Sequence, residues 1–375
     1  MAMASFDVII LGAGIVGSAC AMECAQAGLR VAVVEPSTPG GAATAAGMGH
    51  LVVMDDSPAQ LALSNFSRSL WQELSPTLPS SVEYEQCGTL WVAADDEEMA
   101  EVHAKQHIYA RTGIRSEVLN SSELAQQEPN LRSGLAGGLL VPDDGVIYPP
   151  AASGFLLASA LSLGAKLFGG KAAVALHPGS VRLEDGTTLA ANQIVVATGS
   201  DLRLLPSLPI QKRKGHLVIT DRYPGFVRHQ LVELGYLKSA HKLTSDSVAF
   251  NVQPRKTGQL LIGSSRQYGN DDPAVDASIL SAMVERAQNY MPGLANLSSL
   301  RVWTGFRAAT PDKLPLIGPA SEPGVFLAVG FEGLGITNAP GAARLLTDQM
   351  LGRASAIDPS PFLPSRVPTM ELSHA

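Results

Sequence analysis

Three glycines near the start of the chain have the spacing of a nucleotide-binding turn. Gly12, Gly14 and Gly17 directly follow Phe6–Leu11, a β-branched run typical of a buried parallel strand. A helix is predicted from about Ile15 to Ala27. The first glycine permits a tight turn, the second lets the backbone approach a pyrophosphate, and the third lets the helix lie close to the strand.

Glu35 is the residue that selects among nucleotides. It ends a second short buried strand, RVAVVE, which completes a strand-helix-strand unit. A carboxylate at this position accepts hydrogen bonds from both hydroxyls of an unphosphorylated ribose, so the unit predicts FAD or NAD and excludes NADP. The alternative is a glycine-rich turn that binds no ligand.

Composition and charge limit the class of protein. The 375 residues, 46% hydrophobic and 16% charged, predict a compact globular enzyme of two domains. A formal net charge of -7 without a basic run argues against nucleic acid and anionic membranes as partners. No apolar stretch reaches the roughly 18 residues that a membrane span needs, and Phe6–Met22 lacks the basic start of a signal peptide.

The three cysteines, Cys20, Cys24 and Cys87, are too few and too irregular for a disulfide framework. There is no CxxC motif, so neither a metal site nor a redox disulfide is predicted. These observations favour a reducing, cytoplasmic setting.

The remaining pattern predicts that one domain interrupts another. Residues 39–53 are rich in glycine and alanine and suit backbone that lies against a flat ligand. A helix opens at Ser57 and Pro58, residues 83–93 read as a strand entering a second region, and a helix with a solvated face is expected over Asp95–Arg111.

From Pro149 the helix and strand patterns of the nucleotide domain resume, ending in the strand QIVVATGS at 193–200. After a predicted basic loop at Lys212–Lys214, strands alternate with turns without a long helix, which indicates a sheet-built substrate domain. The last third ends in a strand, a glycine turn and an apolar-periodic helix. Only one GxGxxG is present, so electrons are expected from a small substrate and not from NADH.

Four segments, taken in order, resemble the D-amino-acid oxidase-like FAD-dependent oxidoreductases: DVIILGAGIVG, IVVATG, GFRAATPDKLPLIGP and VGFEGLGITNAPG. The resemblance covers roughly residues 6–350 and includes the glycine oxidase and sarcosine oxidase branches. It implies an α/β fold in which an antiparallel-sheet α+β substrate domain interrupts a glutathione-reductase-like FAD-binding Rossmann domain. The implied ranges are 1–82, 145–214 and 304–355 for the FAD-binding domain, 83–144 and 215–303 for the substrate domain, and 356–375 for a peripheral tail.

The resemblance also implies which positions bind FAD. Those at the ADP half are Gly12, Gly14, Ile15, Val16, Gly17 and Glu35, with Val174 meeting the adenine through its backbone. Those expected along the rest of the cofactor are Thr44, Ala45, Gly47, Met48, Gly49, Ala197, Thr198, Gly199, Gly333, Gly335, Ile336 and Thr337. Backbone amides of the 333–337 loop are expected to stabilise charge on the reduced ring.

Arg307 matches the arginine that holds the substrate carboxylate in this family, and its guanidinium offers a planar two-donor fork. A salt bridge between domains is the alternative role. His50 is expected beside the flavin as a proton-handling or substrate-binding group, with a purely structural histidine as the alternative. Tyr148 and Asn251 lie in segments expected to approach the substrate, although Asn251 replaces the tyrosine common there.

The resemblance implies that a hydride passes from the α-carbon of an amine to flavin N5 and leaves an imine. Residues 43–64 resemble the flavin subunit of bacterial D-hydroxyproline dehydrogenases, which implies D-4-hydroxyproline as substrate and a cyclic imine as product. The implied electron acceptor is a partner subunit or respiratory carrier. Open alternatives are an oxygen-using glycine, sarcosine or D-amino-acid oxidase, an FAD-binding structural subunit of a larger dehydrogenase complex, and an NAD-dependent dehydrogenase.

Overall fold

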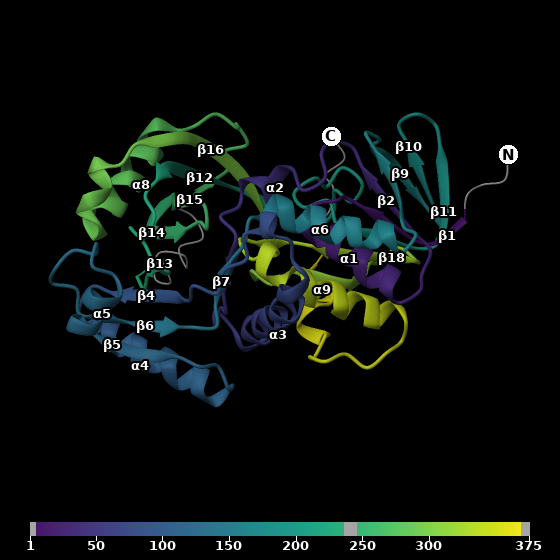
Figure 1. Cartoon of the computed structure of the whole chain (residues 1–375). Coiled ribbons are helices and arrows are strands. Elements are labelled where there is room, and N and C mark those ends of the chain that lie inside the picture. Colours follow the sequence, from purple (N-terminus) through teal and green to yellow (C-terminus); the bar gives the residue numbers. More distant parts are fainter. Residues whose placement is uncertain (1–4, 236–245, 369–375) are drawn as a thin grey trace.

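Two large β-sheets lie side by side in the computed structural model, which describes residues 5–235 and 246–368 (Figure 1). The first has eight strands, in the order β17-β18-β11-β1-β2-β8 with β9 and β10 extending it from β11. Its strands are β1 Ser5–Leu11, β2 Val31–Glu35, β8 Lys166–Gly169, β9 Ala173–His177, β10 Ser180–Leu183, β11 Thr188–Val196, β17 Leu316–Pro319 and β18 Val325–Val329. The centre of this sheet is parallel, as expected for a nucleotide-binding domain.

The second sheet has nine strands and carries the other half of the molecule (Figure 1). Its order is β19-β16-β12-β15-β14-β13-β4-β6-β5, and only the β13–β4 pair is parallel. Its strands are β4 Thr89–Ala93, β5 Glu117–Asn120, β6 Gly137–Val141, β12 Gln211–Arg222, β13 Gln230–Glu233, β14 Ser247–Pro254, β15 Gln259–Tyr268, β16 Ser299–Ala309 and β19 Phe331–Glu332. A two-stranded sheet pairs β3 His50–Leu51 with β7 Gly145–Val146.

Helices cover both sheets. They are α1 Ile15–Gln26, α2 Ala42–Ala46, α3 Pro58–Leu74, α4 Asp96–Arg111, α5 Ser121–Gln127, α6 Pro149–Ser162, α8 Ala277–Tyr290 and α9 Gly335–Met350. Helix α1 packs between α6 and α9 on one face of the first sheet (Figure 1). Gly17 lets the start of α1 lie close to the turn after β1, because a Cβ there would lie 2.0 Å from the carbonyl oxygen of Gly12. No described helix has both the length and the apolar character needed to cross a membrane.

Helix α8 corrects the expectation that the substrate region lacks a long helix. Asp276 caps it by accepting hydrogen bonds from the backbone amides of Ser278 and Ile279. Its buried face packs on the nine-stranded sheet, where the rings of Tyr290 and Phe250 stack with centroids 4.5 Å apart. The apolar spacing that produces this face was present in the sequence, so the helix was predictable.

Two other expectations about organisation differ from the structure. Residues 212–214 are not a loop but lie inside β12, where Lys214 is buried, so the proposed boundary at 214/215 falls within a strand. The tail beyond residue 355 was expected to be peripheral, yet Phe362 is 1% exposed and belongs to the core under α9. Residues 369–375 of that tail lie outside the described range.

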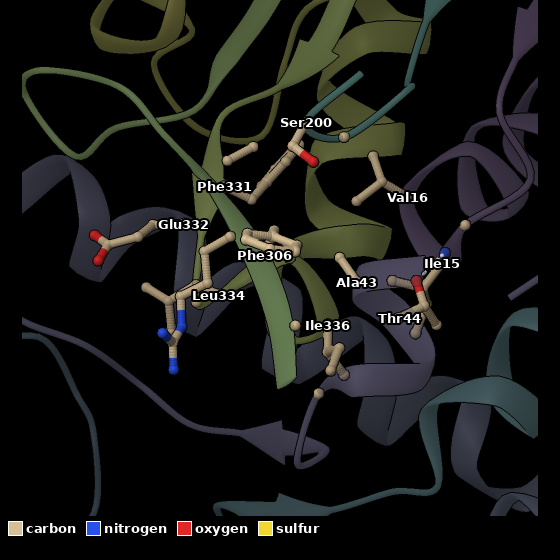
Figure 2. Close-up of a pocket in the computed structure, with 18 of the residues that line it drawn as sticks. Ile15, Val16, Ala43, Thr44, Ser200, Phe306, Phe331, Glu332, Leu334 and Ile336 are labelled. Carbon is tan, nitrogen blue, oxygen red and sulfur yellow. Dashed lines mark hydrogen bonds between the residues drawn. The ribbon is translucent and has the colours of Figure 1, made fainter. Parts of the chain in front are cut away.

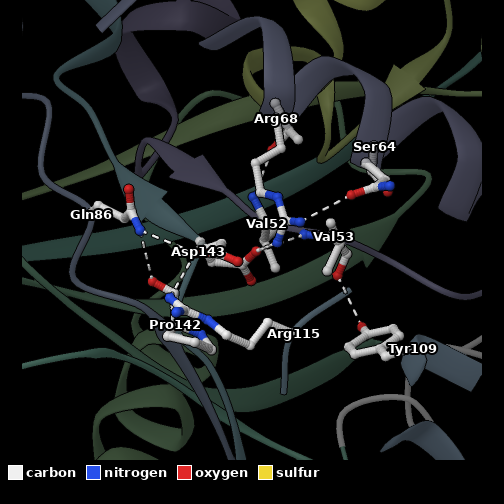
Figure 3. Close-up of polar contacts among 12 residues, drawn as sticks. Val52, Val53, Ser64, Arg68, Gln86, Tyr109, Arg115, Pro142 and Asp143 are labelled. Atoms are coloured by element: carbon white, nitrogen blue, oxygen red, sulfur yellow. Dashed lines mark hydrogen bonds and ion pairs between the residues drawn. The ribbon is translucent and has the colours of Figure 1, made fainter. Parts of the chain in front are cut away.

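A buried ion pair fixes the segment that follows β3. Arg68 of α3 donates from Nη1 to Oδ1 of Asp144 over 3.0 Å, and the amide of Val53 donates to the same oxygen over 3.4 Å. Tyr109 adds a hydrogen bond from its hydroxyl to the carbonyl oxygen of Val53 (Figure 3). Burial raises the pKa of Asp144 to about 6, although the charge of Arg68 opposes the shift. These contacts hold the chain at Val52 and Met54, which line the cavity described next.

Candidate active site

A continuous cavity of about 710 Å³ extends from the edge of the first sheet to the face of the second. Figure 2 shows Ile15 and Thr44 on one side of it and Glu332 on the other, with Phe306 between them. The amino-terminal ends of α1 and α9 both border it, through Ile15 and Ile336. Because a helix start carries partial positive charge, both ends suit a ligand with negative groups.

The end of the cavity near β2 suits an adenosine diphosphate moiety. Glu35 is 8% exposed, and its Oε2 accepts a hydrogen bond from the amide of Ala13 over 2.7 Å. Its Oε1 accepts from the amide and hydroxyl of Ser37 over 2.9 and 3.0 Å. A carboxylate has about four acceptor sites, so it can still receive ribose hydroxyls from the cavity. Thr44 accepts a hydrogen bond from the amide of Ile15 over 3.0 Å, which ties α2 to the start of α1.

Most of the residues predicted to bind FAD line this cavity. They are Gly12, Gly14, Ile15, Val16, Glu35, Thr44, Gly47, Met48, Gly49, Ala197, Thr198, Gly199, Gly333, Gly335 and Ile336. Gly17 lies behind them in the contact between helix and strand, and Ala45 is not part of the lining. These residues can therefore accommodate FAD mainly because glycine-rich backbone passes close to the cavity. Glu35 lies at the end of the cavity near β2, where ribose hydroxyls could bind to it.

Two predicted cofactor contacts are placed differently. Val174, expected to meet the adenine through its backbone, is 47% exposed and outside the lining, whereas its neighbours Ala172 and Ala173 line the cavity. Thr337 is fully buried, and its side chain forms hydrogen bonds with the backbone of the segment around His50. Its hydroxyl donates to the carbonyl oxygen of His50 over 2.8 Å and accepts from the amide of Val52 over 3.3 Å.

At the far end of the cavity, Arg307 of β16 lies over a glycine-lined space. Its Nη1 donates to the carbonyl oxygen of Ser265 over 2.9 Å. Side chains are absent on either side of it, since a Cβ on Gly215 would lie 2.5 Å from Nη1 and one on Gly333 would lie 3.6 Å from Nε. The guanidinium lines the cavity in this position.

Glu332 lies close to this end and is held by other arginines. Its Oε1 lies 2.8 Å from Nη1 of Arg213 and 3.4 Å from Nε of Arg266. Burial alone would raise its pKa, but the charges of Arg266, Arg213 and Arg307 outweigh burial and hold the pKa of Glu332 below its usual value. Three arginines around one carboxylate leave an excess of positive charge, which favours an anionic group in the cavity.

His50 and Asn251 meet at the cavity wall. Nδ2 of Asn251 lies 3.2 Å from Nε2 of His50, and both residues line the cavity. Burial lowers the pKa of His50 to about 4, and the positive charge of Arg307 acts in the same direction. His50 is therefore neutral at physiological pH and offers hydrogen bonding without a charge.

Tyr148 does not join this group. It precedes α6, is 38% exposed, and lies under the guanidinium of Arg255, which is 4.6 Å from its ring centroid. The second sheet also brings to the cavity residues that were not predicted from the sequence, namely Trp91, Gln230, Leu217, Ser264, Arg266 and Phe306. The alternation of apolar and polar side chains along these strands could be seen in the sequence, but it did not indicate which face of the sheet would line a cofactor cavity. In the described ranges, 5–235 and 246–368, no group of three His, Cys, Asp or Glu side chains is arranged to hold a metal ion.

Comparison with known proteins agrees with this geometry. A family model described as FAD dependent oxidoreductase matches residues 7–349. Glycine oxidase of Geobacillus kaustophilus is 27% identical over 95% of this chain and 96% of its own length, and its crystal structure superposes with a TM-score of 0.87 over 97% and 100% of the two chains at 26% identity. Hydrogen cyanide synthase subunit HcnC of Pseudomonas aeruginosa is 26% identical over 96% of both chains.

L-Proline dehydrogenase from P. horikoshii shares the fold, with a TM-score of 0.86 at 23% identity over 97% of this chain and 98% of the other. The antiparallel substrate sheet beside a Rossmann sheet is thus the architecture predicted from the sequence, and that prediction is confirmed. Three findings lead to one conclusion: the family model matches nearly the whole chain, the buried carboxylate of Glu35 lines the cavity, and most of the predicted glycines line it as well. The chain belongs to the family of FAD-dependent oxidoreductases, as an enzyme whose cofactor is FAD.

Proposed function

We propose that this protein oxidises a small amino acid at the carbon next to its nitrogen, and that its substrate is D-4-hydroxyproline, converted to the cyclic imine. The observation that carries the proposal is that one cavity is lined both by the residues predicted to bind the cofactor and by the arginine predicted to bind the substrate carboxylate. Glu35 and the glycine turn lie at one end, and Arg307 lies at the other. The relatives named for glycine oxidation and for L-proline dehydrogenation support a small amino acid or cyclic amine.

Bound FAD supplies a two-electron acceptor for the hydride that leaves the substrate carbon. Arg307 would hold the substrate carboxylate through its planar donors, and its hydrogen bond to Ser265 fixes the plane of that fork. Apolar side chains of Met48, Leu217 and Val232 line the same region and would contact ring carbons while they exclude water. His50, being neutral, would orient the substrate without competing for its carboxylate.

Oxidation of glycine or another small amino acid with oxygen is the second candidate, favoured by the glycine oxidase similarity over the whole chain. For the first candidate, the electron acceptor is a partner subunit or a respiratory carrier. The similarity to HcnC, which is named as a subunit, supports that acceptor. A role limited to structuring a larger complex accounts less well for an arginine directed into the cavity.

The test is anaerobic mixing of the FAD-loaded protein with cis-4-hydroxy-D-proline, D-proline, sarcosine, glycine and D-alanine in turn. Fastest bleaching of the flavin absorption by cis-4-hydroxy-D-proline, followed by slow return of colour in air, is the expected result. Fastest bleaching by glycine or D-alanine with rapid return in air would assign the protein to the oxidases. Bleaching by none of the five would reject an amino-acid substrate of this kind.

A further inference from the structure

Two arginines from different strands line the same end of the cavity. Arg266 lies in β15 and Arg307 in β16, and both belong to the lining. The register places Tyr268 of β15 opposite Arg213 of β12, and Arg213 opposite Arg307. Residues opposite one another share a face of the sheet, and Arg266, two residues before Tyr268, lies on that face as well. The two arginines therefore reach the cavity from one face of the nine-stranded sheet.

The contacts of the two arginines show that their side chains are neighbours. Nη1 of Arg307 donates to the carbonyl oxygen of Ser265, the residue directly before Arg266. Nε of Arg266 lies 3.4 Å from Oε1 of Glu332. A Cβ on Gly333, the next residue, would lie 3.6 Å from Nε of Arg307. Arg266 and Arg307 thus both border the short segment at residues 332 and 333.

The charges at this end of the cavity do not balance. In the part of the chain that the structure describes, Glu332 is the carboxylate in ion-pair contact with these arginines, and its Oε1 is shared by Arg213 and Arg266. Their side chains are at most 12% exposed, so water screens the charges weakly. His50 is neutral and adds no charge. A substrate carboxylate at Arg307 would therefore leave three positive charges facing two negative ones.

A second anionic group on the same small molecule would complete this balance. A buried charge is costly unless an opposite charge accompanies it. A guanidinium carries five N–H donors in one plane and matches the geometry of a carboxylate, so the contact made by Nε of Arg266 does not exhaust its capacity. Because Arg266 lies beside the arginine that would hold the first carboxylate, a short spacing between two carboxylates fits this end of the cavity.

We propose that Arg266 forms a second anion-binding subsite beside Arg307, which accepts the second carboxylate of a short dicarboxylic amino acid such as D-aspartate. The inference goes beyond the proposed function and rests on it in taking Arg307 as the site of the first carboxylate. Oxidation of such a substrate follows the same reaction: the C–H bond at the α-carbon breaks, its electron pair leaves as hydride to the oxidised flavin, and the nitrogen lone pair closes a C=N bond. D-4-hydroxyproline would use Arg307 alone.

The first measurement is binding without turnover. Succinate and propionate differ by one carboxylate, and isothermal titration calorimetry gives their dissociation constants for the FAD-loaded protein. The variants are Arg266→Gln, which removes the charge, and Arg266→Lys, which keeps the charge but lacks the planar pair of donors. The matched control is Arg301→Gln, since Arg301 is an exposed arginine of β16 outside the cavity lining.

The wild-type protein should bind succinate at least about tenfold more tightly than propionate, as one added charge-assisted hydrogen bond predicts. Arg266→Gln should abolish this difference by weakening succinate and should change propionate little. Arg266→Lys should retain part of the difference, and Arg301→Gln all of it. In anaerobic bleaching, the kcat/KM ratio of D-aspartate to D-alanine should fall about tenfold in Arg266→Gln, because these substrates also differ by one carboxylate.

The results that would overturn the subsite differ from those that would overturn the proposed function. Equal affinity of the wild type for succinate and propionate rejects the subsite. A preference that persists in both Arg266 variants also rejects it, and so does a loss that is the same for succinate and propionate, which would assign Arg266 to the fold or the cofactor. Each of these results leaves the proposed function standing. Bleaching by no amino acid rejects the proposed function, whereas the succinate and propionate affinities still decide the subsite.

Discussion

Nη1 of Arg307 donates a hydrogen bond to the carbonyl oxygen of Ser265 over 2.9 Å, so a cavity-lining guanidinium on β16 is anchored to the backbone of β15. The two strands are not neighbours, because β12 lies between them in the sheet. The Arg307 side chain crosses β12 at Gly215, where a Cβ would lie 2.5 Å from the same nitrogen. Three strands thus fix the direction of one side chain.

Replacement of Arg307 by Met should lower kcat/KM for the amino-acid substrate about 100-fold, since losing one partner of a buried charge pair costs about 3 kcal/mol. FAD content should remain close to the wild-type value, because Glu35 and the glycine turn lie at the other end of the cavity. Steady-state kinetics with flavin absorbance check both. The matched control is Arg30→Met, which removes an exposed ion pair with Asp7; equal losses in the two variants would reject the assigned role.

Gly215→Ala should raise KM without unfolding the protein. The added methyl group would meet the end of the Arg307 side chain, which can shift, so the guanidinium moves while the strand remains. We expect a three- to tenfold rise in KM, about 1 kcal/mol of lost binding, with a small change in melting temperature. Gly169→Ala is the control, because the nearest atom to a Cβ on that strand glycine is 3.8 Å away. A KM unchanged by Gly215→Ala would show that the position of Arg307 is not set there.

Gly17→Ala and Gly154→Ala should have opposite effects on stability, although both lie in helices. A Cβ on Gly17 would lie 2.0 Å from the carbonyl oxygen of Gly12, which is backbone and cannot move easily. We expect a loss of about 3 kcal/mol in the free energy of unfolding, as for other overpacked sites. Gly154 in α6 has no atom within 4 Å of a Cβ, so alanine should add about 1 kcal/mol. Urea unfolding measures both, and a neutral Gly17→Ala would contradict the packing described.

Glu35→Ala should weaken FAD binding at least tenfold, because a carboxylate hydrogen bond is worth about 1.5–3 kcal/mol. The protein should also lose stability, since the amides of Ala13 and Ser37 would lose their acceptor. Titration of the FAD-free protein with FAD gives the dissociation constant. Glu117→Ala on the exposed edge strand β5 serves as control and should bind FAD as the wild type does.

The pKa of His50 predicts a pH dependence with a definite sign. The folded-state value of about 4 lies below the ordinary 6.5, so the neutral ring contributes stability that is fully present above pH 6.5 and is lost as pH falls through 4. The shift corresponds to about 3 kcal/mol at 1.36 kcal/mol per unit. His50→Gln should therefore flatten the fall in unfolding free energy between pH 6.5 and 4. His103→Gln, on the exposed side of α4, should leave the fall unchanged, and an equal effect of both would contradict the lowered pKa of His50.

Local patterns in the sequence determined the nucleotide half of the molecule. Gly12, Gly14, Gly17 and Glu35 act within one strand-helix-strand unit, where backbone sterics and strand length fix their positions, and the FAD and family predictions are confirmed. Ser57 was likewise correctly identified at the start of α3, where its side chain accepts a hydrogen bond from the amide of Gln60. Helix α8 was not predicted, although the apolar period that produces its buried face is present in the sequence.

Tertiary structure alone decided what meets in the cavity. Trp91, Val232 and Asn251 come from β4, β13 and β14, and only the pairing of strands far apart in the chain aligns them. Tyr148 looked equally suitable in the sequence, yet the turn before α6 directs it onto Arg255. A sequence records which side chains alternate along each strand, whereas the order of strands in the sheet determines which of them share a face and a cavity. The order of the strands depends on contacts throughout the chain. The cofactor could therefore be predicted from one local segment, whereas the residues that meet in the cavity wall could not.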